Sequence, residues 1–258
     1  MQHKGMNMIN SRTIATPLVV LVTGASRGLG REAALQLAAK GCRLWLGVRD
    51  LAGSQPLVDE VRKRGGQAEL LQLDITKPED IRSAFEKIAA LDGRLDVLVN
   101  NAGVMLDGGW LGNTSLTVSG ATLQQTFDTN FFGTVALTQA LWPLLERASS
   151  ANVVNVSSRM GSNAIHADPD GPLKGAKPFA YDASKAALNA FTTHLAELGR
   201  DANIQVNSAY PGWVRTELGS DYADLSVEEG ARTLVELALL PAGSRTGRFE
   251  FLGEDVPW

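Results

Sequence analysis

The stretch PLVVLVTGASRGLG, residues 17–30, joins an uninterrupted apolar run to a turn that contains three glycines. A short apolar run that ends in a glycine turn is typical of a strand buried on both faces of a sheet. The turn leads into REAALQLAAK, residues 31–40, whose apolar residues recur at helical spacing. The stretch therefore predicts a strand, a tight turn and a helix, which is the first unit of an α/β fold.

The same alternation continues along the chain. Five further short apolar runs are predicted strands, at residues 42–48, 68–74, 95–101, 151–158 and 204–211. Helical patterns lie between them, for example at residues 78–91 and 131–148. Because neither a linker nor a repeat divides the chain, the pattern predicts one domain over residues 17–258. We expect a doubly wound, Rossmann-type parallel sheet with helices on both faces.

Composition narrows the function classes. The chain has 258 residues, 44% of them hydrophobic, and a net charge of −4, so it resembles an ordinary soluble protein and nucleic acid is not an expected partner. No apolar run reaches the roughly 18 residues of a membrane span. Residues 1–16 lack the apolar core of a signal peptide and are predicted to be a flexible N-terminal tail. The single cysteine, Cys42, suits a reducing compartment, so a cytoplasmic location is expected.

The glycine turn is open to two interpretations. Residues 24–28 match G-x-S-x-G, the nucleophile elbow of serine hydrolases, with Ser26 as the nucleophile. The same turn fits a phosphate cradle, in which glycines let the backbone and a helix N-terminus approach a pyrophosphate. Gly30 adds a third glycine, which the cradle requires and the elbow does not. His166 and His194 lie in a loop and an amphipathic helix without a triad setting, so the cradle is favoured.

A second motif is YDASK, residues 181–185, which precedes an apolar-periodic run. Tyr181 and Lys185 are four residues apart and therefore share one helix face. The ammonium can change the chemistry of the phenol, or Tyr181 can simply pack at the start of a helix. The pair alone does not distinguish these alternatives.

Six motifs, in order, make the chain resemble the short-chain dehydrogenase/reductase family, and its carbonyl-reductase-like branch in particular. They are TGASRGLG at residues 23–30, NNAG at 100–103, Asn130 in TNFFG, Ser158 in SRMG, Tyr181 with Lys185, and Pro211-Gly212. The match runs from about residue 17 to the end of the chain. One departure is the distance from Ser158 to Tyr181, which is longer than in many members. The extra residues fall in a Pro/Gly-rich stretch, residues 162–179, which is expected to be a loop.

The resemblance implies a catalytic set of Asn130, Ser158, Tyr181 and Lys185. Tyr181 would be the general acid. Lys185, helped by the positive charge of the oxidised nicotinamide, would lower the pKa of its phenol from about 10 toward neutrality. Ser158 would bond the substrate oxygen, and Asn130 would hold a water for proton resupply. The implied cofactor-binding residues are Gly24, Ser26, Arg27, Gly28, Leu29, Gly30, Arg49, Asp74, Ile75, Asn101, Ala102, Gly103, Tyr181, Lys185, Pro211, Gly212, Val214 and Thr216. No metal is expected.

The expected cofactor is NADP(H). Val48 ends the second strand, at the position where NAD-preferring members carry an acid, and Arg49 follows it. Arg49 and Arg27 would bind a ribose 2′-phosphate through charge-assisted hydrogen bonds. The alternative is that both arginines are solvated, with Asp50 paired to one of them.

The implied activity is an NADPH-dependent oxidoreductase that acts on a small carbonyl compound or the corresponding alcohol. The substrate is expected to be apolar, because the segments around the site offer Met105, Trp110, Met160, Trp213 and Tyr222. A non-catalytic Rossmann module that senses NAD(P) is an alternative, and a serine hydrolase is a further one. The chain is expected to be a monomer or a homo-oligomer.

Overall fold

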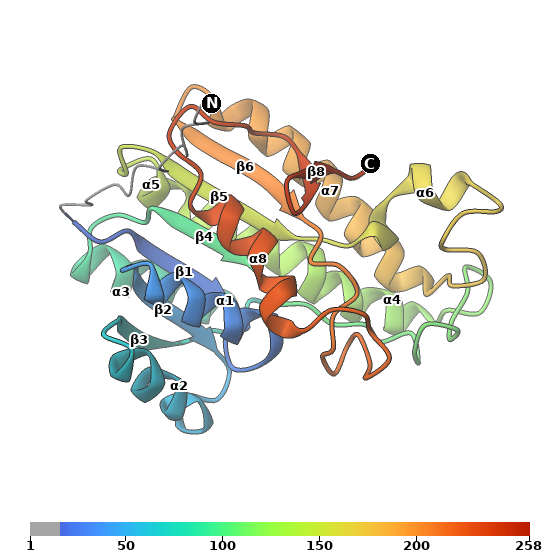
Figure 1. Cartoon of the computed structure of the whole chain (residues 1–258), viewed down its shortest axis with the longest axis horizontal. Helices are drawn as coiled ribbons and strands as arrows, with labels where there is room; N and C mark the ends of the chain where they lie inside the picture. The colour runs from blue at the N-terminus through green and yellow to red at the C-terminus, as the bar shows by residue number, and fades with distance from the viewer. Residues whose placement is uncertain (1–15) are drawn as a thin grey trace, which may run out of the picture.

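The computed structural model describes residues 16–258, so the predicted tail lies outside the described residues except for Thr16. An eight-stranded sheet runs through the molecule in the order β3-β2-β1-β4-β5-β6-β7-β8 (Figure 1). All neighbouring strands are parallel except β7 and β8. The strands are β1 Val19–Thr23, β2 Arg43–Val48, β3 Gln67–Gln72, β4 Val97–Asn100, β5 Ala151–Val156, β6 Ile204–Ala209, β7 Phe249–Phe251 and β8 Glu254–Asp255.

Within residues 16–258, eight α-helices and two short turns connect the strands. The α-helices are α1 Gly28–Ala39, α2 Leu51–Lys63, α3 Pro78–Leu91, α4 Gly120–Phe127, α5 Thr134–Leu145, α6 Asn163–Ala167, α7 Phe179–Gly199 and α8 Val227–Ala238. A π-helical turn, η1 Asp128–Gly133, joins α4 to α5, and a 3₁₀ turn, η2 Arg159–Gly161, follows β5.

The helices cover the two faces of the sheet, with α1 and α8 in front and α5 and α7 behind in Figure 1. Alternate residues of β1 point to opposite faces, as expected for a strand. Val20 and Val22 pack with α1, α2 and α8, whereas Val19 and Leu21 pack with α3, α5 and α7. Two apolar layers therefore share one central strand.

A chain of buried polar side chains fixes α7 to the sheet. The Asn100 amide donates to the Asn155 oxygen at 2.8 Å, and the Asn155 amide donates to the Thr192 hydroxyl at 2.9 Å. Thr192 and Ser208 share a further hydrogen bond of 2.8 Å. These bonds join β4, β5 and β6 to α7, the helix that begins with the Tyr181 motif.

The predicted fold class is confirmed, because the structure is a single-domain α/β unit with a mostly parallel sheet between helices. The sequence analysis did not predict β7 and β8, which have three and two residues. The stretch 162–179, expected to be a loop, contains the short helix α6. Ser162 caps α6 by accepting a hydrogen bond from the backbone N–H of Ile165 at 3.1 Å.

Candidate active site

The site lies where the strand order reverses between β1 and β4, at the carboxyl ends of the strands. Thr23 and Asn101 fasten these two ends together. The Thr23 hydroxyl accepts from the backbone N–H groups of Asn101 and Ala102, at 2.9 and 3.0 Å. The Asn101 amide donates in return to the carbonyl oxygens of Thr23 and Gly24, at 2.8 and 3.2 Å. The NNAG motif thus holds the glycine turn in place.

The glycine turn needs its glycines for two different reasons. Gly24 and Gly28 have φ angles of +63° and +55°, in the left-handed region that favours glycine. A Cβ on Gly30 would overlap the Asn101 amide and lie 2.5 Å from the Gly24 oxygen. After the turn, the N-terminus of α1 lies at the carboxyl edge of the sheet. No side chain caps this N-terminus. Uncapped backbone N–H groups at a helix N-terminus bind phosphate, so the turn fits the pyrophosphate of a dinucleotide cofactor.

The alternative role of Ser26 as a hydrolase nucleophile finds no support in the contacts. Ser26 is exposed. Among residues 16–258, no hydrogen bond joins it to a histidine or an acid; His166 instead bonds Met160 and Lys177, and His194 is exposed on α7. The acid and base that a triad requires are therefore not assembled around this serine.

Asn130 lies in the π-helical turn η1 and is buried. Its side-chain amide forms two hydrogen bonds with the backbone of Val104: it accepts from the N–H and donates to the carbonyl oxygen, each at 2.8 Å. It also donates to the Ser184 hydroxyl at 3.0 Å. A Cβ on Gly103 would lie 3.4 Å from the Asn130 oxygen and 3.5 Å from the Lys185 ammonium, so both atoms face the same point beside NNAG.

Tyr181, Lys185 and Ser158 come together as the motifs suggest. Tyr181 and Lys185 lie in the first two turns of α7, and the Lys185 nitrogen is 5.7 Å from the centre of the Tyr181 ring. Lys185 also donates to the Val156 carbonyl oxygen at 2.8 Å, at the end of β5. Ser158 follows β5, accepts from the Met160 N–H at 3.1 Å and interacts with the Tyr181 phenol. All three side chains are buried.

The electrostatics of this cluster differ from the expectation for Lys185. Burial raises the pKa of the Tyr181 phenol well above its ordinary value, the hydrogen bond with Ser158 opposes the rise, and Asp182 and Tyr210 add to it. Burial lowers the pKa of the Lys185 ammonium to about 8. In the chain itself, burial is the largest influence on the pKa of each group, and Lys185 is not among the influences on the pKa of Tyr181.

Asp107 is a functional residue that sequence reasoning missed. Its buried carboxylate accepts from the backbone N–H groups of Ala180 and Tyr181, at 2.9 and 3.1 Å. Pro178 precedes α7 without a side-chain cap, so Asp107 caps this helix from a distant segment. The only feature of the sequence that could have indicated this role is that α7 starts without a capping side chain of its own.

A second unforeseen cluster links the 162–179 segment to α7. The His166 Nε2 atom is 2.8 Å from the Met160 carbonyl oxygen and 3.2 Å from the Asp182 carboxylate. The Lys177 ammonium is 2.7 Å from Nδ1 of the same ring. With the ring neutral, Nε2–H donates on one side and Nδ1 accepts on the other. The segment is thereby fastened beside Tyr181.

Apolar side chains surround Tyr181. Met105, Trp110 and Met160 belong to one cluster with Tyr181, and the ring of Trp110 meets that of Tyr181 edge to face at 6.4 Å. From the segment after Pro211-Gly212, the cluster includes Leu218. The other two expected wall residues are not members of this cluster: Trp213 donates to the Gly219 carbonyl oxygen, and Tyr222 is 88% exposed.

The expected ribose end of the site carries Arg27 and Arg49, both exposed. Arg27 forms an ion pair with Glu217 at 3.2 Å. Asp50 accepts from the Gly53 N–H at 3.1 Å and so caps α2 rather than pairing with an arginine. Val48, at the end of β2, is buried and offers no charge to a ribose.

The remaining predicted cofactor residues line the same edge. The Asp74 carboxylate accepts from the Thr76 N–H and hydroxyl, at 3.1 and 2.7 Å. Although burial opposes it, these bonds and the Arg49 charge hold the pKa of Asp74 below its ordinary value. A methyl group of Thr216 lies 3.5 Å from where a Cβ on Gly28 would stand. Four further predicted positions lie at least partly buried around this edge: Leu29, Ile75, Pro211 and Val214.

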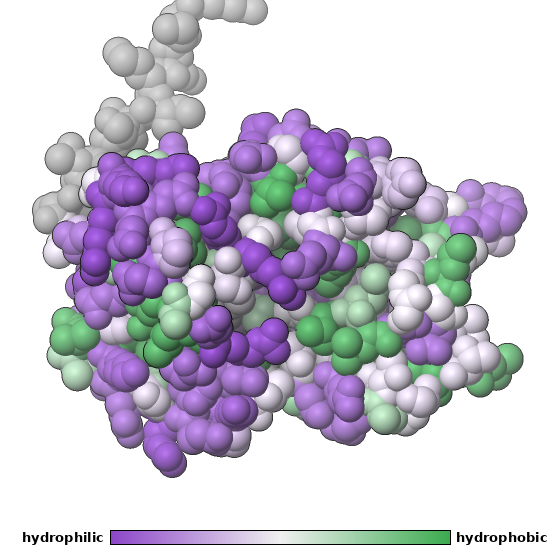
Figure 2. Space-filling model, turned by 90° about the horizontal axis from the view of Figure 1, so that it is seen from below, coloured by the Kyte–Doolittle hydropathy of each residue, from purple (hydrophilic) through white to green (hydrophobic). Residues whose placement is uncertain are grey.

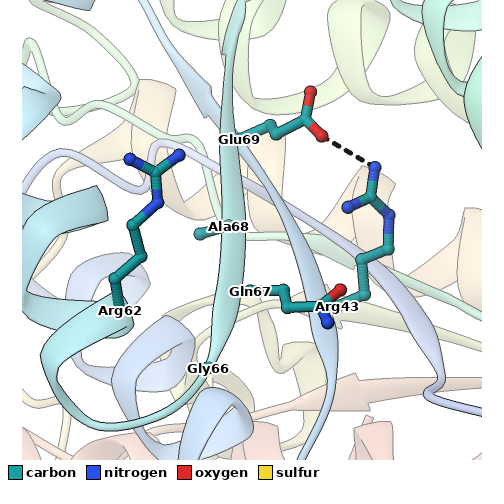
Figure 3. Close-up of a pocket in the computed structure, with 6 residues that line it drawn as sticks. All are labelled: Arg43, Arg62, Gly66, Gln67, Ala68 and Glu69. Carbon is teal, nitrogen blue, oxygen red and sulfur yellow. Dashed lines mark hydrogen bonds and ion pairs between the residues drawn. The ribbon is translucent and has the colours of Figure 1, made fainter.

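Surface polarity and a surface hollow point to different parts of the molecule. In Figure 2, hydrophobic residues gather at and beyond the right of centre, on the side where Figure 1 shows α4 and α6. A hollow of about 300 Å³ lies instead at the amino ends of β2 and β3 (Figure 3). Arg43 and Glu69 form an ion pair of 2.8 Å beside it, and Arg62 comes from α2. This hollow is separate from the Tyr181 site.

A parallel sheet with a glycine cradle at its reversal point, beside a buried tyrosine, lysine and serine, defines a dinucleotide-dependent oxidoreductase site. Comparisons agree with this class. The family model for the short chain dehydrogenase matches residues 18–226. "Short-chain dehydrogenase/reductase 1" of Saponaria officinalis is 33% identical over 96% of this chain and 98% of its own length. The (+)-neomenthol dehydrogenase of Arabidopsis thaliana is 32% identical over 88% of this chain and 93% of its own length.

A crystal structure of NADPH-bound carbonyl reductase from chicken fatty liver has a TM-score of 0.81 and 28% identity, covering 94% of this chain and 100% of that chain. The chain belongs to the short-chain dehydrogenase/reductase family, as its motifs predicted. It is an oxidoreductase of a family that uses a nicotinamide cofactor and small-molecule substrates. Within residues 16–258, none of the helices has the length and apolar character of a membrane span.

Proposed function

We propose that the protein is an NADPH-dependent reductase of small carbonyl compounds, able to run in reverse on the corresponding alcohols. The observation that carries the proposal is the cluster of Tyr181, Ser158 and Lys185 beside the glycine cradle. Two groups that can hold and protonate a carbonyl oxygen, Tyr181 and Ser158, lie with a lysine that can resupply the proton, at the edge where the family's cofactor would bind.

Tyr181 is the proposed general acid. Its raised pKa keeps the phenol protonated at neutral pH, which is the form that can donate a proton to a carbonyl oxygen. Ser158, which interacts with the phenol, holds the same oxygen through its hydroxyl. The Tyr181 backbone is fixed by Asp107, so the phenol is positioned before a substrate arrives.

Lys185 and Asn130 are the proposed proton-resupply pair. The Lys185 ammonium and the Asn130 oxygen both face Gly103, and Asn130 has one lone pair of that oxygen left after it binds Val104. A water held there would connect Lys185 to solvent. The pKa of about 8 lets Lys185 exchange protons near neutrality.

The glycine turn, with Thr216 beside it, and the α1 N-terminus would hold the pyrophosphate of the cofactor, which supplies or accepts the hydride when bound. The preference for NADPH over NADH is supported by Arg27 and Arg49, by the uncharged Val48 and by the engagement of Asp50 in the α2 cap. The similar carbonyl reductase from chicken is NADPH-bound.

The test is oxidation of NADPH against a panel of ketones and aldehydes, with Tyr181→Phe compared to wild type. General acid catalysis typically contributes about 10²- to 10⁴-fold, so kcat should fall by about 100-fold or more while cofactor affinity is kept. Tyr222→Phe is the matched control, because Tyr222 is 88% exposed and outside the cluster. A Tyr181→Phe variant as active as Tyr222→Phe would refute the role of Tyr181. Binding of NADPH without turnover of any carbonyl would favour the non-catalytic sensor.

A further inference from the structure

Arg159 directly follows Ser158 and begins the turn η2. The turn is held tightly against α7, because a Cβ on Gly161 would lie 2.6 Å from the Lys185 carbonyl carbon. Since adjacent Cα atoms are about 3.8 Å apart, the base of the Arg159 side chain lies close to the proposed substrate-oxygen site. Arg159 is partly buried, and its guanidinium stands 5.9 Å from the centre of the Tyr210 ring.

Arg159 differs from the other partly buried arginines of residues 16–258. Arg31 pairs with Glu60, Arg43 with Glu69 and Asp92, and Arg94 with Asp96. For Arg159, the described part of the chain supplies the Tyr210 ring but neither a carboxylate within ion-pair distance nor a hydrogen-bond acceptor. The guanidinium is only partly covered, and its planar donors suit a carboxylate.

Arg159 and Tyr210 come from the same edge of the sheet as Ser158. They follow the carboxyl ends of the neighbouring strands β5 and β6, which pair at Val156 and Ala209. Asp224 raises the pKa of Tyr210 but, within residues 16–258, does not pair with Arg159. The acid nearest Tyr181 in the chain, Asp182, is engaged by His166. The positive charge of Arg159 is therefore left for a ligand.

We propose that Arg159 is a specificity residue that selects carbonyl substrates with an apolar body and a carboxylate. The proposal rests on the proposed reductase function and names the substrate class of the same site. The guanidinium binds the carboxylate, in a charge-assisted and bidentate manner, while Ser158 and Tyr181 hold the carbonyl oxygen. The apolar body packs on the cluster of Met105, Trp110 and Met160.

The test uses the three isomers of formylbenzoate and their neutral methyl esters as substrates with NADPH. For at least one isomer, wild type should show a kcat/KM about tenfold or more higher for the acid than for the ester. Arg159→Met should bring this ratio close to one while leaving kcat/KM for the ester within about threefold, since the methylene stem is kept. Arg159→Lys should keep part of the preference.

Arg200→Met is the control, because Arg200 is an exposed arginine at the end of α7. It should leave the ratio unchanged. The inference is overturned if wild type prefers none of the acids, or if Arg159→Met weakens acid and ester alike.

Binding of benzoate in the presence of NADPH, followed by tryptophan fluorescence, separates this inference from the proposed function. Wild type should bind benzoate, and the Kd of Arg159→Met for benzoate should be higher by about tenfold or more. If no carbonyl is reduced but this difference holds, the reductase function fails and the anion site stands. If neutral carbonyls are reduced but Arg159→Met binds benzoate as wild type does, the anion site fails alone.

Discussion

Two neighbours of Tyr181 in the chain, Asp182 and Lys185, are buried, and burial moves their pKa values toward one another. Burial, with the nearby Asp107, raises the pKa of Asp182 to about 8, against a lowering by Lys177. Burial lowers the pKa of Lys185 to about 8. Near neutral pH the carboxyl is therefore mostly uncharged and the ammonium mostly charged. Near neutral pH, Lys185 is therefore the charged member of the two beside the Tyr181 ring.

Replacing Asp182 with Asn should change how stability depends on pH. Between about pH 4 and pH 8, Asp182 keeps its proton in the folded protein but loses it in the unfolded chain. The contribution of this residue to the unfolding free energy is therefore full below about pH 4 and is lost as pH rises toward 8. Asn has no such proton, so the Asp182→Asn variant does not lose this stability. As pH rises across this window, its unfolding free energy should increase relative to that of wild type by at least about 1 kcal/mol. Urea unfolding at pH 5 and pH 8 measures the change.

Asp170→Asn supplies the comparison, since the Asp170 side chain is 85% exposed and paired with Lys174. Its difference from wild type should stay nearly constant over the same range. A constant difference for Asp182→Asn as well would contradict the raised pKa.

The proposed preference for NADPH is also tested at single residues. Arg27→Ala and Arg49→Ala should each reduce the ratio of kcat/KM for NADPH to that for NADH by about tenfold or more, because each removes a charged donor from the expected 2′-phosphate. Arg62→Ala, at the hollow of Figure 3, should leave the ratio unchanged. Steady-state kinetics with both cofactors provide the ratios, and a wild type that prefers NADH would overturn the assignment.

At the scale of the element, α7 depends on a cap from outside itself. Asp107→Ala removes the acceptor of two helical N–H groups and should lower the unfolding free energy by about 1–3 kcal/mol. It should also lower kcat, because Tyr181 sits on the first turn of α7. Asp107→Asn keeps one oxygen and should lose less.

The capping box of α8 gives a matched control for Asp107. Ser226 accepts from the Glu229 N–H at 3.2 Å, and Ser226→Ala should cost a similar amount of stability without lowering kcat. Thermal unfolding and turnover are measured for all three variants. An equal loss of kcat in Ser226→Ala and Asp107→Ala would show that Asp107 has no particular role in the site.

Elements that are determined by residues near one another in the sequence could be predicted, and those that depend on the rest of the fold could not. The strands β1, β2, β4, β5 and β6 were predictable because burial on both faces leaves a continuous apolar run. The edge strands β7 and β8 are too short for any periodicity and exist only because β6 is already in place. The glycine turn and YDASK were predictable because their chemistry lies within a few residues.

Contacts between distant segments escaped the sequence analysis. Asp107 is 74 residues from Tyr181 along the chain, and no local sequence pattern predicts the hydrogen bond between them. The link from His166 to Asp182 and the stacking of Arg159 on Tyr210 likewise depend on the completed fold. Burial, the largest influence on the pKa of Tyr181, likewise cannot be read from the spacing of a motif.

At the scale of the whole molecule, the two apolar layers share the sheet and should unfold together. Leu234→Ala in the first layer and Leu137→Ala in the second should each lower the unfolding free energy by about 2–5 kcal/mol. Circular dichroism and tryptophan fluorescence should give coincident urea transitions for both variants. Separate transitions would show that the layers are independent folding units.

The antiparallel strand β8 has a consequence for how the molecule behaves in a crowded solution. A bare strand at the border of a sheet invites pairing with another chain and so leads to aggregation. Here β8 has only two residues, Glu254 and Asp255, both exposed and acidic. The opposite border, β3, exposes Gln67 and carries Glu69. The short length of β8 and the charged side chains on both border strands oppose the addition of further strands.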